Sequence, residues 1–394
     1  MISPNEWRGV VAEVLPTAIE LRRAIHRHPE LSHQEFATTE RVATALRQAG
    51  IRPRVREVGT GLTADIGSGA RMVAFRADLD ALPIDEPADN PFASQIPGVM
   101  HACGHDAHTA IGAGIAIALS QVDLPGRIRF VFQPAEESFP GGAIEMVREG
   151  AIDEVSSILA FHVDPNLAVG TLGLRTGAIT GSADRFTIRL EGPGGHTARP
   201  HRTVDLIYAA GRVITELPAL LDRLVDTRRA LTVVFGRVSG GVAANVIPTS
   251  VELGATLRTL DRELWDELPP LIEELAVAIA APTGAKVAVE YLRGIPPVVN
   301  DPGVIDQARA AITDQLGPTA IVPTATSMGA EDFSKYLERI PGALLRLGSS
   351  PRSGSVDLHS AQFLFDERAL EQGIVAGAAT LLRMLESAVG PLLP

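Results

Sequence analysis

Short apolar runs alternate with amphipathic helical stretches in the first half of the chain, and this alternation limits the folds that it can adopt. Residues 72–75, 127–132 and 157–161 each have the length and composition of a buried strand. The stretches between them, 108–119 and 142–149, have helical character. Strands that alternate with helices form βαβ units around a mostly parallel sheet. The sequence therefore predicts an α/β fold with such a sheet.

The pattern changes after about residue 182. The order becomes strand, helix, strand, strand, helix, strand, which is the ferredoxin-like split βαβ arrangement. Pro218 is expected to kink or end the first of these helices, and Pro269 with Pro270 to break the second. We therefore expect one large α/β domain made of residues 1–181 and 296–394, interrupted by a smaller α+β domain at 182–295.

Charge and hydropathy exclude some classes of protein to which the chain could belong. The 35 basic and 47 acidic side chains give a net charge of −12, which repels phosphate backbones and argues against nucleic-acid binding. The longest apolar run, 110–119, is half of the roughly 20 residues that a membrane span needs. No basic patch followed by an apolar stretch opens the chain, and its single cysteine fits a reducing compartment. We expect a cytoplasmic protein without membrane partners.

Acidic and imidazole side chains follow four of the predicted strands. Asp78 and Asp80 come after the first, Glu136 and Glu137 after the second, and the third runs into His162. Near the end of the chain, a strand and a loop lead to His359. The carboxyl ends of parallel strands share one edge of the sheet, where ligands bind. These side chains are therefore expected to converge.

The densest cluster is HACGHDAH, residues 101–108, which contains three histidines and the only cysteine. A free cysteine alone is more often a small buried hydrophobe. With His105 two residues after Cys103, ligation of zinc or a similar ion becomes the better interpretation. His101, Asp106 and His108 are candidates for groups that orient the ligands.

The remaining polar residues have both functional and purely structural interpretations. Adjacent carboxylates such as Glu136 and Glu137 can be a solvated helix start, but metal-assisted hydrolysis needs one to hold an ion and one to accept a proton. Asp78 and Asp80 can cap a helix or pair with Arg76. The histidines of HRHPELSHQE are interpreted as structural. In the insert, three residues are individually weak candidates: His196, Asn245 and Arg258.

Taken together, these segments resemble a known family, the di-metal amidohydrolases related to aminoacylase and bacterial carboxypeptidases. The branch of hippurate hydrolases and of auxin–amino acid conjugate hydrolases is the most similar. The resemblance spans residues 21–363 and rests on LRRAIHRHPELSHQE, FRADLDALP, MHACGHDAHTA, FQPAEE, FHV, GPGGHTARP, NVIP, MGAEDFS and DLHSAQF.

The resemblance implies a set of site residues. Glu136 matches the general acid/base, and His196 a histidine of the inserted lid or dimerisation domain that reaches the partner's site. Asn245 and Arg258 match positions where related lids contact the substrate. Asp78 occupies a position where distant relatives have a ligand histidine, so neither Asp78 nor Asp80 is counted as a ligand. The implied metal ligands are Cys103, His105, Glu137, His162 and His359.

The resemblance also implies a function. Two divalent ions per subunit (zinc, manganese, cobalt or nickel) would be held in a homodimer formed through the insert. Glu136 would act as general base on metal-bound water, which cleaves the amide of an N-acyl amino acid carrying a hippurate-, acetyl- or indole-acetyl-like acyl group. Three alternatives stay open: a metallocarboxypeptidase or dipeptidase on short peptides, a thiol hydrolase using Cys103, and a catalytically silent metal-binding scaffold.

Overall fold

The computed structural model describes residues 4–88, 90–350 and 356–386. The chain forms two compact units, which are described separately. Unit 1 contains Met1–Gly177, Val299–Ala325 and Asp332–Pro394, and unit 2 contains Ala178–Val298 with Thr326–Glu331. The short 326–331 segment thus belongs with unit 2 although the chain on both sides of it belongs to unit 1.

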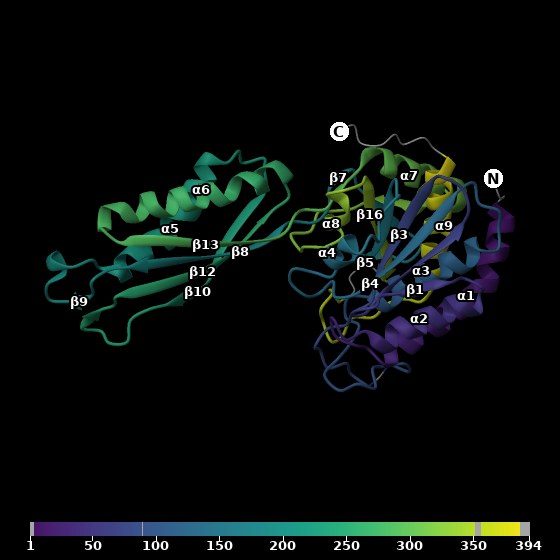
Figure 1. Cartoon of the computed structure of the whole chain (residues 1–394), viewed down its shortest axis with the longest axis horizontal. Helices are drawn as coiled ribbons and strands as arrows, with labels where there is room; N and C mark the ends of the chain where they lie inside the picture. The colour runs from purple at the N-terminus through teal and green to yellow at the C-terminus, as the bar shows by residue number, and fades with distance from the viewer. Residues whose placement is uncertain (1–3, 89, 351–355, 387–394) are drawn as a thin grey trace. The chain divides into compact units, whose positions relative to one another are not determined.

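Unit 1 is built on one eight-stranded mixed sheet (Figure 1). The four central strands are mutually parallel, and antiparallel pairing occurs only toward the two sides. In spatial order the strands are β1 (Pro53–Val55), β2 (Leu62–Gly67), β4 (Arg127–Gln133), β3 (Met72–Asp78), β5 (Ile158–Ala168), β16 (Gly342–Ser350), β6 (Leu172–Leu174) and β15 (Ile321–Pro323). This arrangement confirms the predicted α/β class.

The central strands bring their polar residues to one level of the sheet. Asp78, the last residue of β3, pairs with Gln133, the last residue of β4. On the other side, Arg76 pairs with Ala160 in β5, so Asp78 stands level with His162 two residues further along. The convergence expected from the sequence follows from this register.

Helices surround the sheet of unit 1. Helix α3 is buried along its whole length, because it is apolar on all sides after its first turn. It packs against α1 and α9. The helices of this unit are α1 (Pro4–Arg27), α2 (Phe36–Gln48), α3 (His105–Leu119), α4 (Ala143–Arg148), α7 (Pro302–Leu316), α8 (Ser334–Leu337) and α9 (Arg368–Glu386), with the 3₁₀ turn Pro318–Ala320.

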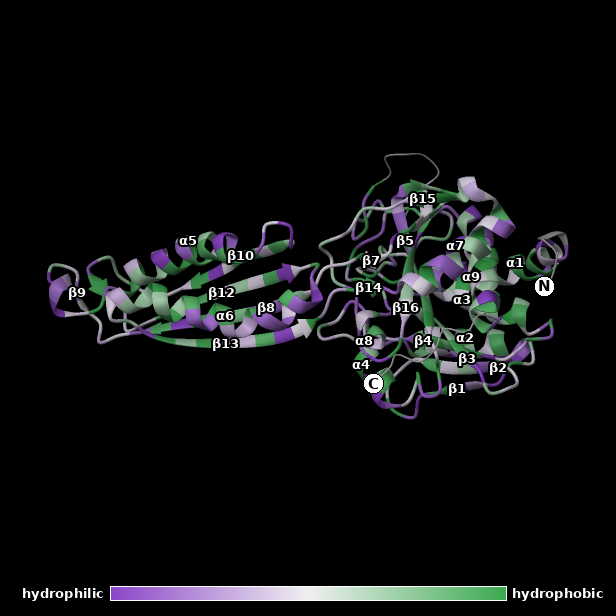
Figure 2. Ribbon diagram, turned by 90° about the horizontal axis from the view of Figure 1, so that it is seen from above, coloured by the Kyte–Doolittle hydropathy of each residue, from purple (hydrophilic) through white to green (hydrophobic). Residues whose placement is uncertain are grey.

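Unit 2 has the predicted ferredoxin-like arrangement. Its sheet is antiparallel, in the order β10 (Leu231–Ser239), β12 (Ser250–Thr259), β8 (Ala183–Glu191) and β13 (Lys286–Ile295). Helices α5 (Leu206–Leu224) and α6 (Arg262–Ala280) cover one face (Figure 1), and hydropathy alternates along the strands (Figure 2). Shorter elements of this unit are β9 (Gly195–His196), β11 (Val246–Ile247) and the 3₁₀ turns Pro200–Arg202 and Ala281–Thr283. The pair β7 (Gly177–Ala178) and β14 (Val299–Asn300) lies where the chain passes from one unit to the other.

The expected effect of proline on these helices is wrong in part. Helix α5 continues through Pro218, and α6 continues through Pro269 and Pro270. Each helix buries an apolar stripe against the sheet, including Leu217 in α5 and Leu268 in α6. This packing outweighs the lost backbone hydrogen bonds. Within the described residues, we find no helix with the length and apolarity needed to cross a membrane.

Candidate metal centre and active site

Four segments of unit 1 deliver the five candidate ligands to one place. Cys103 directly precedes α3, and His105 is the first residue of that helix. Glu137 follows β4, and His162 lies in β5. His359 lies in the loop between β16 and α9, and its backbone N–H donates to Ala102 O at 2.9 Å. This last bond ties the distant loop to the cysteine segment.

The structure brings these donor atoms into contact distance of one another. Cys103 Sγ lies 3.5 Å from His162 Nε2 and 3.3 Å from His359 Nε2. His359 Nε2 lies 3.0 Å from Glu137 Oε1. Two sets, each with atoms within 4.8 Å of one another, share the cysteine: Cys103 with His105 and His162, and Cys103 with Glu137 and His359. All five predicted ligands are therefore together.

Hydrogen bonds orient His105 and His162 through one nitrogen of each ring, so that the second nitrogen of each ring is available to bind an ion. His105 Nδ1 lies 2.9 Å from the carbonyl oxygen of Asp80, so this nitrogen carries the proton. Its Nε2 is buried and has no hydrogen-bond partner among the residues that the structure describes. His162 Nδ1 donates to Val163 O at 2.8 Å, which leaves Nε2 facing Cys103. Buried lone pairs beside a thiol form a donor set that fits zinc or another borderline-soft divalent ion.

Asp78 and His108 form a different kind of contact. His108 Nδ1 donates to Asp78 Oδ1 at 2.7 Å, and His108 Nε2 accepts from Val163 N–H at 2.9 Å. Both ring nitrogens of His108 are therefore engaged. The group of Asp78, His105 and His108 is compact enough for an ion, but it offers no spare His108 lone pair. His108 instead supports the backbone next to His162.

A buried arginine anchors Asp78. Arg76 Nη1 donates to Asp78 Oδ2 at 2.6 Å, which is the pairing foreseen as the structural interpretation of this aspartate. Burial alone raises the pKa of Asp78, but its interactions with His105, His108 and the Arg76 guanidinium outweigh this effect and hold that pKa well below its ordinary value. Asp78 is thus a buried anion within the supporting network.

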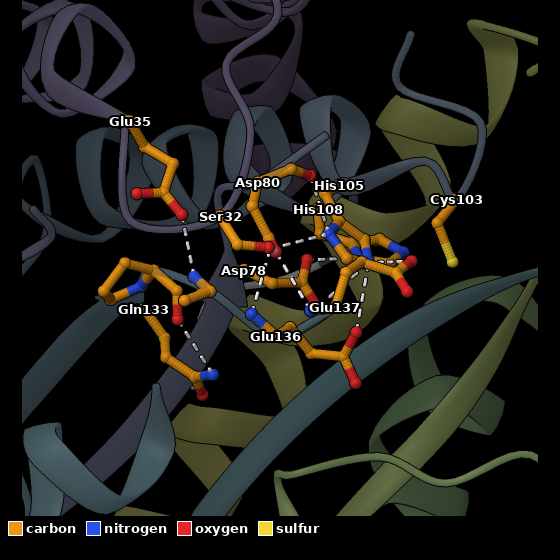
Figure 3. A network of polar contacts seen from close by, with 12 residues as sticks. Ser32, Glu35, Asp78, Asp80, Cys103, His105, His108, Gln133, Glu136 and Glu137 are labelled. Carbon is orange, nitrogen blue, oxygen red and sulfur yellow. Dashed lines mark hydrogen bonds and ion pairs between the residues drawn. The ribbon is translucent and has the colours of Figure 1, made fainter. Parts of the chain in front are cut away.

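The Glu136–Glu137 pair stands in a sharply turned loop (Figure 3). Ala135 before it has a positive φ of 55°. The backbone N–H groups of Glu136 and Glu137 donate to the two carboxylate oxygens of Asp80 at 3.1 and 2.9 Å. The Glu136 carboxylate lies 3.9 Å from His105 Nε2. Glu136 therefore stands beside the ligand cluster.

Burial and the neighbouring imidazoles act on the pKa of the cysteine in opposite directions. Burial raises the pKa of the Cys103 thiol, although the neighbouring imidazoles oppose this change. Contacts with Cys103 and Glu137 raise the pKa of His359 to about 10.

Gly104 between Cys103 and His105 has φ of 78°, and a Cβ there would meet Val163 Cγ2 at 2.6 Å. Only glycine allows this turn.

Behind the cluster lies a second buried network. Arg22 Nε donates to Asp106 Oδ2 at 2.6 Å, and His26 Nδ1 lies 2.8 Å from the same oxygen. Burial, countered by the charges of Arg22 and His26, leaves the pKa of Asp106 far below its ordinary value. This network agrees with the structural interpretation of His26, and it fixes the first turn of α3.

Unit 2 carries the remaining candidates. His196 is exposed in β9 and pairs with Val246 of β11, so it stands beside the exposed Asn245. Thr197 N–H donates to Asn245 O at 3.3 Å. Arg258 is half-buried in β12, and its Nη1 donates to Met328 O at 2.7 Å. The structure thus brings His196 and Asn245 together, whereas Arg258 lies on a different strand.

Sequence reasoning missed two supporting groups. One is Glu35, which is buried and accepts a hydrogen bond from Ala135 N–H across 100 positions of sequence. The other is Asp332 of MGAEDFS, whose carboxylate binds Arg76 and Gln133. The sequence did offer a signal, since both residues lie in strings that carry the family resemblance, LRRAIHRHPELSHQE and MGAEDFS. An acidic residue in such a string is a candidate for a buried carboxylate with a polar partner, because carboxylates are rarely buried without one.

Comparisons with known proteins identify the family of this chain. A profile described as peptidase family M20/M25/M40 matches residues 74–386. The chain is 47% identical over 358 residues to a Rhodococcus jostii protein named "Putative glutamate--cysteine ligase 2-3", covering 90% of this chain but only 45% of that protein. It is 36% identical to an N-acetyl-L-cysteine deacetylase of Bacillus subtilis, covering 94% of this chain and 88% of the relative.

Two further similarities extend over nearly whole chains. Thermostable carboxypeptidase 2 of Saccharolobus solfataricus is 33% identical, with 96% of this chain and 98% of the relative covered. A Bacillus subtilis crystal structure, described as a dinuclear metal binding peptidase from the M20 family, is 36% identical, with a TM-score of 0.85 and coverage of 95% and 99%. With the family profile matching most of its length, this chain is a hydrolase that belongs to peptidase family M20/M25/M40.

Proposed function

We propose that this hydrolase removes the acyl group from N-acyl amino acids by metal-dependent amide hydrolysis. Two divalent ions would be held by Cys103, His105, Glu137, His162 and His359. The observation that carries the proposal is the pair of donor sets that share Cys103 beside the Glu136 carboxylate. The deacetylase name of one relative and the dinuclear description of the solved neighbour support it.

The chemistry divides between the ions and the protein. When bound, divalent ions supply Lewis-acid chemistry, which polarises an amide carbonyl and makes water a nucleophile near neutral pH. Glu136 is placed to accept the proton of that water and to return it to the leaving amine nitrogen. The water oxygen then forms the new bond to the acyl carbon, and the C–N bond breaks.

We further propose that unit 2 completes the site in a homodimer. An exposed histidine beside an exposed amide side chain, His196 and Asn245, is suited to stabilise a developing oxyanion and to hold a substrate oxygen. Arg258 offers a positive charge for the substrate carboxylate. Mixing inactive Glu136→Gln and inactive His196→Ala subunits tests this arrangement. Partial recovery of activity supports shared sites, and no recovery contradicts them.

A carboxypeptidase is the second candidate function, because a relative with that name matches nearly the whole chain. Both reactions cleave the amide next to an amino acid that bears a free carboxylate. They differ in whether the acyl side is a simple acid or a peptide. A substrate panel that varies the acyl group and the amino acid independently separates them. Faster turnover of acetyl- or benzoyl-amino acids than of dipeptides supports the amidohydrolase.

The decisive variant is Glu136→Gln. It keeps the size of the side chain but cannot accept the proton, so kcat should fall by about 10³-fold or more while both ions stay bound. Glu145→Gln, on α4, is the matched control and should keep full activity. Near-normal turnover by Glu136→Gln contradicts the proposed role. Activity that survives a chelator but not iodoacetamide would favour the thiol alternative.

A further inference from the structure

The HPELSHQE segment has a contact pattern that a purely structural role does not explain. Three of its side chains reach the loop that carries Glu136, or the aspartate that binds this loop. Ser32 Oγ donates to Asp80 Oδ2 at 2.6 Å. His33 Nε2 lies 3.2 Å from Ser138 Oγ, and Glu35 Oε1 accepts from Ala135 N–H at 2.8 Å. Figure 3 shows Ser32, Glu35 and Asp80 around the loop.

The loop itself adopts a conformation that needs outside support. Ala135 is fully buried and lies in the left-handed region, which is unfavourable for a residue with a Cβ. Its turn aims three successive N–H groups, of Ala135, Glu136 and Glu137, at carboxylates. Glu35 accepts the first and Asp80 the other two. Such a concave row of N–H groups is a strong anion site, and here side chains of the protein fill it.

Two further hydrogen bonds hold the Glu35 carboxylate itself in place. Thr60 Oγ1 donates to Glu35 Oε2 at 2.5 Å, and His33 N–H donates to Oε1 at 3.0 Å. Both Glu35 and Thr60 are buried. The neighbouring Gly61, with φ of 94°, lies so close to the loop that a Cβ would meet Pro134 Cδ at 2.7 Å. The Glu35 carboxylate therefore has one available geometry, fixed before any substrate binds.

We propose that Glu35 is a positioning residue, which sets the direction of the Glu136 carboxylate by holding the N–H of Ala135 in the left-handed turn. This inference rests on the proposed function, because it concerns the proton-transferring group of that reaction. Glu35 itself is not among the candidate ligands. Its effect reaches Glu136 through the backbone of one residue, so it should alter kcat and leave substrate binding nearly unchanged.

The test compares three variants of the full-length, metal-loaded enzyme. Glu35→Ala removes the acceptor, and kcat should fall about 30–100-fold with KM within about threefold. Glu35→Gln keeps an oxygen for the Ala135 and His33 N–H groups and should retain at least a third of kcat. Glu30→Ala is the matched control, because Glu30 accepts N–H groups of Ala37 and Thr38 at 3.1 and 2.7 Å. It should lower stability with kcat unchanged.

A second readout needs no substrate. Amide hydrogen exchange of a peptide spanning residues 133–142 should become at least tenfold faster in Glu35→Ala, but not in Glu35→Gln or Glu30→Ala. Both bound ions should remain when the metal is in excess. Because exchange reports on the loop directly, it keeps its meaning even when every N-acyl amino acid tested is inert, an outcome that would instead refute the proposed function.

Three results would overturn the positioning role. These are unchanged kcat and exchange in Glu35→Ala, equal damage by Glu35→Gln, and loss of ions at saturating metal. Should Glu35→Ala not fold, Thr60→Val tests the same role, because it removes the hydroxyl that donates to Glu35 Oε2 and nearly keeps the side-chain volume. It loosens the Glu35 carboxylate and should lower kcat about three- to tenfold, with faster exchange in the same peptide. Unchanged values for both quantities would again refute the proposal.

Discussion

Arg76 shows how single residues support the centre from within the sheet. Its side chain has no solvent exposure, and it donates to Gln133 Oε1, Asp78 Oδ2 and Asp332 Oδ1 at 2.8, 2.6 and 2.9 Å. Two buried carboxylates thus share one guanidinium. Asp78 also binds His108, whose ring accepts the N–H next to His162. A charge in β3 is therefore connected to a candidate ligand in β5.

Replacing Arg76 by methionine should destabilise the protein strongly. The substitution keeps the aliphatic stem but leaves Asp78 and Asp332 buried without their cation, for which we expect a loss of about 3–5 kcal/mol. Urea unfolding monitored by circular dichroism measures it. Arg54→Met is the control, since Arg54 forms an exposed pair with Asp65, and its loss should stay below about 1 kcal/mol. Equal losses for both would contradict this view of Arg76.

What the sequence could predict at this scale depends on distance along the chain. Cys103 and His105 lie two positions apart before a helix, and their chemistry is visible in the string itself. The Asp78–Arg76 pair was also foreseeable from local spacing. The contact between Glu35 and Ala135 was not, because no local pattern links residues 100 positions apart. The ligand role of the five residues stays a prediction that their proximity supports.

At the scale of elements, the sequence pattern identified the central strands of unit 1 and the strands of the unit 2 sheet, but it missed β1, β2, β6 and β15 and not every expected effect of proline was right. The runs at 72–75 and 127–132 became β3 and β4, because short stretches rich in β-branched and aromatic residues pack well in a sheet that is buried on both faces. Helix α6 passes through Pro269 and Pro270 because tertiary packing decides helix continuity more than local propensity does. Sequence rules for breakers lack that packing information.

Strand β8 provides a test of stability against pH. Asp184 near its start accepts N–H of Gly294 at 2.6 Å and the Tyr291 hydroxyl at 3.1 Å. Burial raises the pKa of Asp184, and these hydrogen bonds only partly oppose it. A carboxyl with a raised pKa in the folded state contributes full stability below its unfolded pKa, near 3.9, and loses it as pH rises through the folded pKa.

Asp184→Asn should therefore gain stability relative to the unmodified protein as pH rises from about 4 to 7. Denaturant unfolding at several pH values measures the difference. Tyr291→Phe is the companion variant, since it removes one opposing hydrogen bond and should make the loss of stability with pH larger. A difference between Asp184→Asn and the parent that stays constant across this range would show that Asp184 does not titrate as described.

For the whole of unit 1, the candidate centre joins segments that are far apart in the chain. Ions bound only by the folded state stabilise it by about 2.7 kcal/mol each when their concentration is 100 times Kd. Dialysis against a chelator should therefore lower the melting temperature by several degrees and abolish hydrolysis. Zinc, manganese, cobalt or nickel should restore both. His359→Ala, at a half-exposed position that is proposed to bind an ion, should show a smaller metal-dependent shift, and an equal shift would argue against His359 as a ligand.

Anomalous diffraction from crystals of the metal-loaded enzyme is the most direct measurement of the paired-ion centre. Data collected at the absorption edge of the bound metal should show two peaks in each subunit. Each peak should lie within bonding distance of donor atoms from the proposed ligand set, which is Cys103, His105, Glu137, His162 and His359. A single peak, or peaks bound instead by Asp78 and His108, would contradict the assignment of the ligands and with it the proposed reaction.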